Sequence, residues 1–226
     1  ADVVKTFPHA RNLLDSKKNN GNRIVQEFIE GLSFGTEIHG CNGKYKIFPP
    51  FLFSTNQYGI TSPKQSIKIG PVTSKRFKLK NLYKMLGKLA KKINFSGIAQ
   101  VDLVFSKGKW YIIEINPRLS GMSQTIAAAA GKSIFTLLKE SSYGKSKSKN
   151  LKKIIEVKFP VLPLEKIEEI RQNKNLIFLQ QLKNDEANQR REEGFCQIVA
   201  GAAKNFTELK NILTELKKDF PDELED

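Results

Sequence analysis

Two apolar runs joined by a short turn constrain the fold of this chain more than any other feature. The first run, residues 98–105, is rich in branched residues, and the second, residues 110–115, is aromatic and branched. The turn between them reads Ser106-Lys107-Gly108. Two such runs separated by three residues that include a glycine predict a β-hairpin. The sequence therefore predicts an antiparallel sheet as part of the core.

Three side chains on this hairpin carry oxygen donors. Glu114 and Asn116 are two residues apart, so they leave the same face of their strand. Asp102 lies on the partner strand and faces the same side if the register allows. Two carboxylates and an amide oxygen are hard donors, of the kind that holds Mg²⁺ together with substrate phosphates. On spacing alone an alternative stays open, in which the acids are solvated or paired with a nearby lysine.

The segment VDLVFSKGKWYIIEINPRLSG resembles the core hairpin of the ATP-grasp superfamily. In that family an acidic residue on one strand and E-x-N-P-R on the next bind Mg²⁺ and the phosphates of ATP. The matching positions here are Asp102 and, twelve residues later, Glu114, followed by Asn116 and Arg118. The resemblance implies that Asp102, Glu114 and Asn116 hold Mg²⁺ or Mn²⁺.

The same resemblance implies roles for the residues that follow the hairpin. Arg118 would be catalytic, because a planar guanidinium matches the oxygens of a transferred phosphoryl group. A surface ion pair is the alternative for this residue. Ser120 and Gly121 would border the substrate or the transferred phosphate.

The segment IVQEFIEG, residues 24–31, is similar to the family stretch whose backbone binds the edge of adenine. The resemblance implies that adenine is lined by Gln26, Glu27, Phe28 and Ile29. Two residues after the glycine the family often has an acid that holds the ribose hydroxyls, and here that position is Ser33. Ribose binding is therefore expected to be weaker or handled by a neighbour, and both Ser33 and Glu37 are candidates for binding the nucleotide. A plain buried strand is the alternative for residues 24–31.

His39 leaves the same strand face as Glu37. A catalytic role is possible for this histidine, but no Ser, Cys or Asp partner lies within reach in the sequence. A hydrogen-bonded residue of a sheet is therefore the favoured interpretation.

Periodicity and turn residues predict the remaining elements. Strands are expected within residues 34–53 around an Asn42-Gly43 turn, and at 153–159, 176–182 and 195–203. Helices are expected at 7–16, 77–93, 125–130, 133–143, 163–171 and 206–220, and loops at 17–23 and 56–71. The fold class is α+β, a partial ATP-grasp fold in which helices pack an antiparallel sheet, with a small α/β carboxy-terminal lid. We expect the carboxy-terminal part of an ATP-grasp domain at 1–143, a linker at 144–153 and a small α/β subdomain at 154–226.

Composition and net charge limit the kinds of partner and the cellular setting expected for this chain. No apolar run approaches the roughly 20 residues that cross a bilayer. Cys41 and Cys196 are far apart without metal-ligand spacing, which suggests a reducing compartment and hence the cytoplasm. The net charge of +15 favours anionic partners. Zinc-finger and RNP-type motifs are absent and aromatic residues do not interleave the basic runs, so nucleic-acid binding is not favoured.

The resemblance implies an ATP-dependent ligase that activates a carboxylate as an acyl phosphate with Mg-ATP and joins it to an amine or a similar nucleophile. Its partners would be ATP, small carboxylate and amine substrates, and an upstream amino-terminal region. That region is expected because no Rossmann-like domain, phosphate-binding lysine or glycine-rich loop precedes residue 24. Two alternatives stay open, a non-catalytic binding or regulatory module that keeps the fold, and a basic nucleic-acid-binding protein.

Overall fold

A computed structural model of the chain describes residues 6–15, 26–54, 66–142, 151–159, 161–182 and 195–203, together with residues 211 and 214. The helices are α1 (Phe7–Asp15), α2 (Leu79–Lys92), α3 (Gly121–Ala129), α4 (Ile134–Ser142) and α5 (Leu164–Gln172), and a 3₁₀ turn, η1 (Lys75–Phe77), precedes α2. The strands are β1 (Leu32–Cys41), β2 (Lys44–Ile47), β3 (Phe51–Phe53), β4 (Ser66–Gly70), β5 (Gly97–Ser106), β6 (Lys109–Asn116), β7 (Lys153–Phe159), β8 (Leu176–Leu182) and β9 (Phe195–Ala203).

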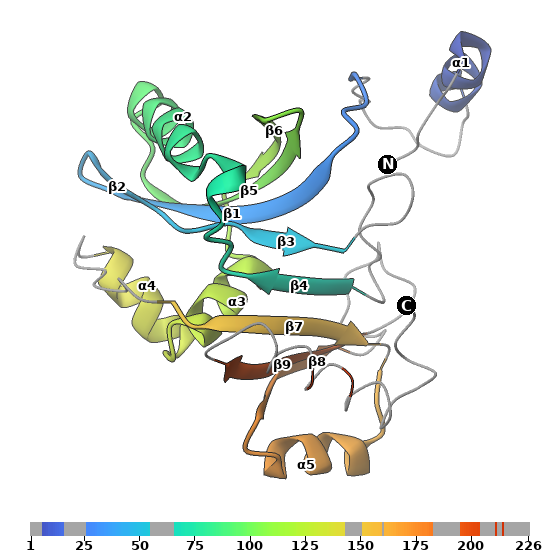
Figure 1. Ribbon diagram of the computed structural model, residues 1–226, viewed down its shortest axis with the longest axis vertical. Helices are drawn as coiled ribbons and strands as arrows, with labels where there is room; N and C mark the ends of the chain where they lie inside the picture. Colours follow the sequence, from blue (N-terminus) through green and yellow to red (C-terminus); the bar gives the residue numbers. More distant parts are fainter. Residues whose placement is uncertain are drawn as a thin grey trace.

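Nine strands of the described residues form one sheet in the order β6-β5-β1-β3-β4-β7-β9-β8, with β2 paired to β1. The strand pairs are antiparallel throughout. The sheet runs across the molecule from β5 and β6 to β8 and β9 (Figure 1). Strand β7, which follows the predicted linker, pairs directly with β4. The elements on the two sides of residues 144–153 thus share a sheet, and the division into two domains there stays a prediction.

The two predicted hairpins are confirmed. Strands β5 and β6 are joined through Lys107 and Gly108, whose φ angles are 46° and 77°. Strands β1 and β2 are joined through Asn42 and Gly43, with φ angles of 49° and 73°. Left-handed conformations at both central residues match the twist of the flanking strands, and glycine adopts them without steric cost.

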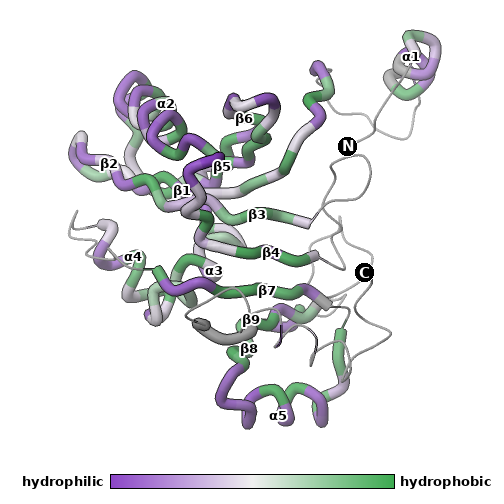
Figure 2. The backbone as a smooth tube through the Cα atoms, viewed as in Figure 1, coloured by the Kyte–Doolittle hydropathy of each residue, from purple (hydrophilic) through white to green (hydrophobic). Residues whose placement is uncertain are grey.

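Helix α2 covers one face of the sheet. Its buried residues Leu82, Leu86 and Ala90 recur every four positions, so they form one apolar stripe. The stripe packs in a cluster with Phe34 of β1 and Leu103 of β5, among others. In Figure 2, α2 alternates between hydrophilic and hydrophobic residues, as expected for a helix with one face in solvent.

Helices α3 and α4 cover the opposite face. Met122, Ile126 and several alanines of α3 pack with Phe51 of β3 and Ile154 of β7. The short side chains of residues 127–129 let the helix approach the strands closely. This face is the one to which the candidate site belongs.

Most predicted elements are confirmed, and two need correction. Residues 66–70, predicted as loop, form strand β4, because Ile67 and Ile69 alternate with Lys68 and pair with β7. Helix α3 begins at Gly121, four residues before its predicted start, because Ser120 caps it. The predicted loop at 17–23 and most of the predicted helix at 206–220 lie outside the described residues.

No helix in the described part of the chain is both long enough and apolar enough to cross a membrane.

The two cysteines are expected to differ strongly in reactivity. Cys196 on β9 is fully buried, and burial raises the pKa of its thiol to about 12. Cys41 at the end of β1 is only partly buried, and its thiol donates to the carbonyl oxygen of Ser142 at 3.0 Å. Since the thiolate is the reactive form, iodoacetamide at pH 8 should label Cys41 at least about a hundredfold faster than Cys196. Mass spectrometry of the native protein measures both labelling rates. Equal rates in the native protein would contradict this prediction, whereas equal rates after denaturation would not.

Candidate functional site

Polar side chains cross the sheet on the face that α3 covers. Residues directly opposite each other on antiparallel strands share a face, as do residues two apart on one strand. By this rule and by the hydrogen bonds described below, the polar face comprises Glu114 and Asn116 (β6), Gln100 and Asp102 (β5), Glu37 (β1), Lys68 (β4), Glu156 (β7), Gln197 (β9) and Gln180 (β8). The amino-terminal end of α3 lies against the middle of this polar face, where it contacts Glu37 and Glu156.

The three residues predicted to hold a metal ion lie together on this face. Asp102 is directly opposite Glu114, and Asn116 is opposite Gln100, two pairs along the ladder and therefore on the same face. The amide of Gln100 donates to Oδ1 of Asp102 at 2.7 Å, which orients that carboxylate. Glu114 is exposed, whereas Asp102 is partly buried. Within the described residues neither carboxylate forms an ion pair, so the lysine-paired alternative finds no support there.

The electrostatics of Asp102 suit a cation. Its pKa is raised chiefly by burial and also by the nearby Glu114, and it is lowered by the hydrogen bond from Gln100 and by the charges of Arg118 and Lys68. Two carboxylates held side by side repel each other, and a divalent ion would relieve that repulsion. The described part of the chain has no group of three acidic, histidine or cysteine residues that could hold a metal ion by themselves. An ion here would therefore also need oxygens from Asn116 and from a bound substrate, which is the mode that Mg²⁺ commonly uses.

Arg118 follows β6 and is exposed to solvent. Its Nη1 donates to the carbonyl oxygen of Leu119 at 3.3 Å. No ion pair to this guanidinium occurs among the residues that the structure describes. The charge of Arg118 nevertheless acts on Asp102, so the guanidinium lies near the metal-binding candidates.

Ser120 ends the loop after Arg118 and caps α3. Its hydroxyl accepts from the backbone N–H of Met122 at 3.0 Å, and the Ser123 hydroxyl accepts from the backbone N–H of Ser120 at 3.3 Å. This reciprocal pair satisfies N–H groups that a helix would otherwise leave without partners. Gly121 is the first residue of the helix.

Glu37 anchors that cap to β1. Its Oε1 accepts from the hydroxyls of Ser123 at 2.5 Å and Ser120 at 3.4 Å, and its Oε2 is 2.8 Å from Nε2 of His39. The other ring nitrogen of His39 bonds to the hydroxyl of Ser141 on α4. The interpretation of His39 as a hydrogen-bonded sheet residue is confirmed. Glu37 has no exposed surface, which argues against its predicted contact with ATP.

The segment predicted to line adenine precedes β1. Gln26, Glu27 and Phe28 are exposed and Ile29 is partly buried, with Phe28 at 53% exposure although it is a large apolar side chain. Ser33 pairs with Val104, two positions along β1 from the Gly35–Asp102 pair. The segment therefore enters the sheet at the strand that neighbours the Asp102 hairpin.

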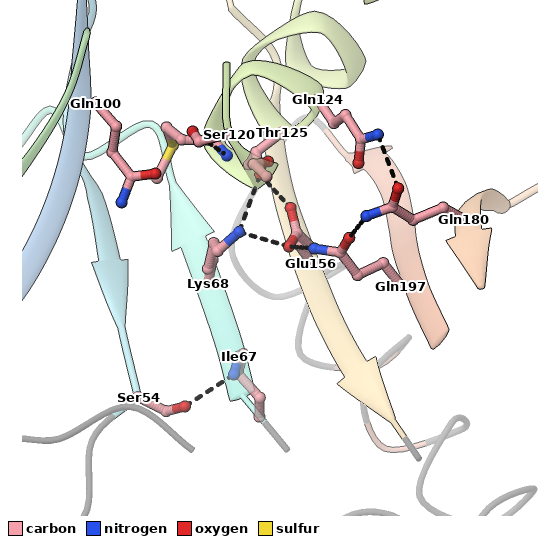
Figure 3. Close-up of polar contacts among 12 residues, drawn as sticks. Ser54, Ile67, Lys68, Gln100, Ser120, Gln124, Thr125, Glu156, Gln180 and Gln197 are labelled. Carbon is pink, nitrogen blue, oxygen red and sulfur yellow. Dashed lines mark hydrogen bonds and ion pairs between the residues drawn. The ribbon is translucent and has the colours of Figure 1, made fainter. Parts of the chain in front are cut away.

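A second polar cluster on this face was not among the predicted site residues. Nζ of Lys68 donates to Oε1 of Glu156 at 2.6 Å and to the hydroxyl of Thr125 at 3.3 Å, and that hydroxyl also bonds to Oε2 of Glu156 (Figure 3). The amide of Gln197 donates to Oε1 of Glu156 at 2.8 Å and accepts from Gln180 at 2.5 Å. We call Lys68, Thr125, Glu156 and Gln197 the Lys68 cluster.

The sequence did contain a signal for this cluster. Lys68 and Glu156 each interrupt a short apolar run, SIKIG and KIIEVKF. A charged residue inside such a run costs free energy unless it is paired, so each predicts a partner. The partners are 88 positions apart, and nothing in either run identifies the other.

Comparison with known proteins agrees with this fold. The chain matches the ATP-grasp domain family over residues 4–122, which is more than half of its length. It therefore belongs to the ATP-grasp family, as its hairpin predicted.

The relatives are longer proteins. The chain is 29% identical over 136 residues to the carbamoyl-phosphate synthase of Methanobrevibacter smithii, an alignment that covers 59% of this chain and 37% of that protein.

Solved structures extend the likeness across the sheet. A phosphoribosylaminoimidazole carboxylase ATPase subunit from Aquifex aeolicus superposes with a TM-score of 0.61 and 16% identity, over 86% of this chain and 57% of that one. Biotin carboxylase from Campylobacter jejuni gives 0.61 and 13%, over 88% and 47%. An L-amino acid ligase from Bacillus licheniformis gives 0.58 and 15%, over 84% and 53%. At these identities the structures share the fold, and the chain spans about half of each.

Proposed function

We propose that this chain is part of an ATP-dependent ligase, which activates a substrate carboxylate as an acyl phosphate and joins it to an amine or a similar nucleophile. The observation that carries the proposal is the β5–β6 register, in which Asp102 is opposite Glu114 and Asn116 lies on the same face, two pairs along the ladder. Two cations, Arg118 and Lys68, act on the same carboxylate. Membership of the ATP-grasp family and the ligases among its structural neighbours support this proposal.

Asp102, Glu114 and Asn116 would hold Mg²⁺ or Mn²⁺, since their oxygens are the donors these ions prefer. The ion would supply neutralisation of charge on the phosphates of ATP. The backbone of residues 26–29 would bind adenine, with Ser33 at the ribose position. An upstream amino-terminal region would complete the nucleotide site, and a reducing, cytoplasmic setting would suit the two free cysteines.

In the proposed reaction a carboxylate oxygen of the substrate attacks the γ-phosphorus of ATP. The bond from that phosphorus to the β,γ-bridging oxygen breaks, and ADP leaves with the electron pair. Arg118 stabilises the charge on the transferred phosphoryl group. The amine then attacks the acyl carbon, phosphate leaves, and the amine nitrogen loses a proton to solvent. Positioning and electrostatic stabilisation carry this chemistry, so it requires no side-chain nucleophile.

Thermal unfolding with and without Mg-ATP tests the proposal, on this chain and on the full-length protein. A ligand that binds only the folded state stabilises it by about 2.7 kcal/mol at a hundred times its Kd. We expect the full-length protein to respond and the double variant Asp102→Ala with Glu114→Ala to lose the response. Glu168→Ala, an exposed carboxylate of α5, is the matched control and should respond normally. If neither protein responds to any nucleotide, the proposal is wrong.

One observation favours a second candidate, a non-catalytic binding module with the same fold. The ribose position is Ser33 instead of an acid, and the neighbouring Glu37 is fully buried. Such a module would be stabilised by Mg-ATP but would form no ADP with any carboxylate and amine, which separates it from the ligase.

A further inference from the structure

The Lys68 cluster leaves donor groups open toward the start of α3. We infer that Lys68, Gln197 and the open corner beside Gly121 form a subsite that binds the carboxylate of the substrate. This inference rests on the proposed function and adds to it the residues that would hold the acid.

Lys68 has one N–H donor that makes no hydrogen bond among the described residues. An ammonium group has three N–H donors, and the described residues take two of them, through Glu156 and Thr125. The side chain keeps 16% of its surface exposed, whereas that of Glu156 keeps 2%. The buried carboxylate therefore fixes the position of Nζ, and the third donor can reach a ligand from solvent.

Gln197 contributes a second donor in the same place. Its amide nitrogen has two N–H donors, of which Glu156 takes one at 2.8 Å. Its amide oxygen already accepts from Gln180, which fixes the orientation of the group. The nitrogen thus faces the corner with one hydrogen available.

The absence of a side chain at Gly121 keeps this corner open. A Cβ atom at residue 121 would lie 3.4 Å from Nε2 of Gln197 and 3.7 Å from Nζ of Lys68. Both donors therefore border the space that any larger residue would fill. Figure 3 shows Lys68 reaching from β4 toward the start of α3, where Ser120 and Thr125 lie.

The groups that line the corner favour an anion, and the position of the corner indicates that this anion is the substrate carboxylate. The open groups are a cation and an amide N–H, both donors, which suit a carboxylate. Lys68 lies on the same polar face of the sheet as Asp102, so the corner is on the side where the metal ion and the ATP phosphates would be. A carboxylate held in this corner by Lys68 and Gln197 would lie next to the γ-phosphate of ATP, which its oxygen attacks in the proposed reaction.

Gly121→Ala tests the subsite without removing a charge. A methyl group there meets its neighbours at ordinary contact distances, and alanine is a good helix former, so the variant should fold. The probes are bicarbonate, acetate, inorganic phosphate and the standard L-amino acids, each added at millimolar concentration to the full-length protein. We expect at least one carboxylate to raise the unfolding midpoint of the wild type, and Gly121→Ala to weaken its apparent affinity at least about tenfold.

A second variant removes the donor instead of the space. Lys68→Met with Glu156→Gln neutralises both partners at similar size, and it should lose the same carboxylate shift. Lys84→Met, an exposed lysine of α2, is the matched control and should behave as wild type.

Each outcome decides the inference. It is overturned if no carboxylate shifts the wild type, if only phosphate does, or if both variants keep the carboxylate shift. The Mg-ATP response is scored separately. If that response is absent while the carboxylate shift is present and sensitive to both variants, the ligase proposal fails and the subsite remains.

Discussion

Converting Asp102 and Glu114 to amides is expected to lower Mg-ATP-dependent ADP formation by the full-length protein at least about a hundredfold. The variant Asp102→Asn with Glu114→Gln keeps the shape of both side chains and removes both charges. Its unfolding midpoint should stay the same or rise, because burial and the neighbouring carboxylate disfavour the charged form of Asp102 and raise its pKa. Groups that lower stability and support activity mark a functional site.

The control variant should remove a carboxylate that lies outside the proposed site. Glu168→Gln on α5 removes an exposed carboxylate that pairs with Arg171 at 2.8 Å, and it should leave both activity and midpoint near wild type. A double-amide variant that keeps its activity, or that loses activity only in proportion to lost folded protein, would remove Asp102 and Glu114 from the proposed site.

Lys68→Met is expected to lower the free energy of unfolding by about 3–5 kcal/mol, the range measured when one partner of a buried ion pair is removed. The variant leaves Glu156 with 2% of its side chain exposed and without its counter-charge. Glu156 also holds Thr125 of α3, so the loss should extend to the packing of that helix. Urea unfolding of both proteins, followed by far-UV circular dichroism, measures the difference.

Adding Glu156→Gln to Lys68→Met should restore most of the lost stability, since no uncompensated charge is then buried. Lys132→Met is an instructive control, because its ion pair with Glu140 at 2.5 Å is about a quarter exposed on both sides and should be worth much less. If Lys68→Met lowers the free energy of unfolding no more than Lys132→Met does, the Lys68–Glu156 pair does not stabilise the fold in the way proposed.

Two buried carboxylates on different strands hold α3 against the sheet. Glu37 of β1 binds its cap through Ser120 and Ser123, and Glu156 of β7 binds Thr125 one turn later. The loop that carries Arg118 ends at that cap. Both carboxylates thus fix the backbone next to Arg118, as expected of a scaffold that positions the side chain proposed to be catalytic.

Local sequence patterns were enough to predict the elements that need only neighbouring residues. The hairpin of β5 and β6 follows from two β-rich runs around a glycine turn, and α2 follows from apolar residues at helical spacing. The shared face of Glu114 and Asn116 follows from the two-residue repeat of a strand. Each of these depends on backbone geometry over a few positions.

Tertiary structure alone decided the rest of the polar face. Whether Asp102 faces Glu114 depends on strand register, which one residue of slip would reverse. The pairing of Lys68 with Glu156 joins positions 88 residues apart, and the burial of Glu37 depends on where α3 packs. A charged residue inside an apolar run predicts that the fold will supply a partner for it. Only the packing of β4, β7 and α3 determines which partner it receives.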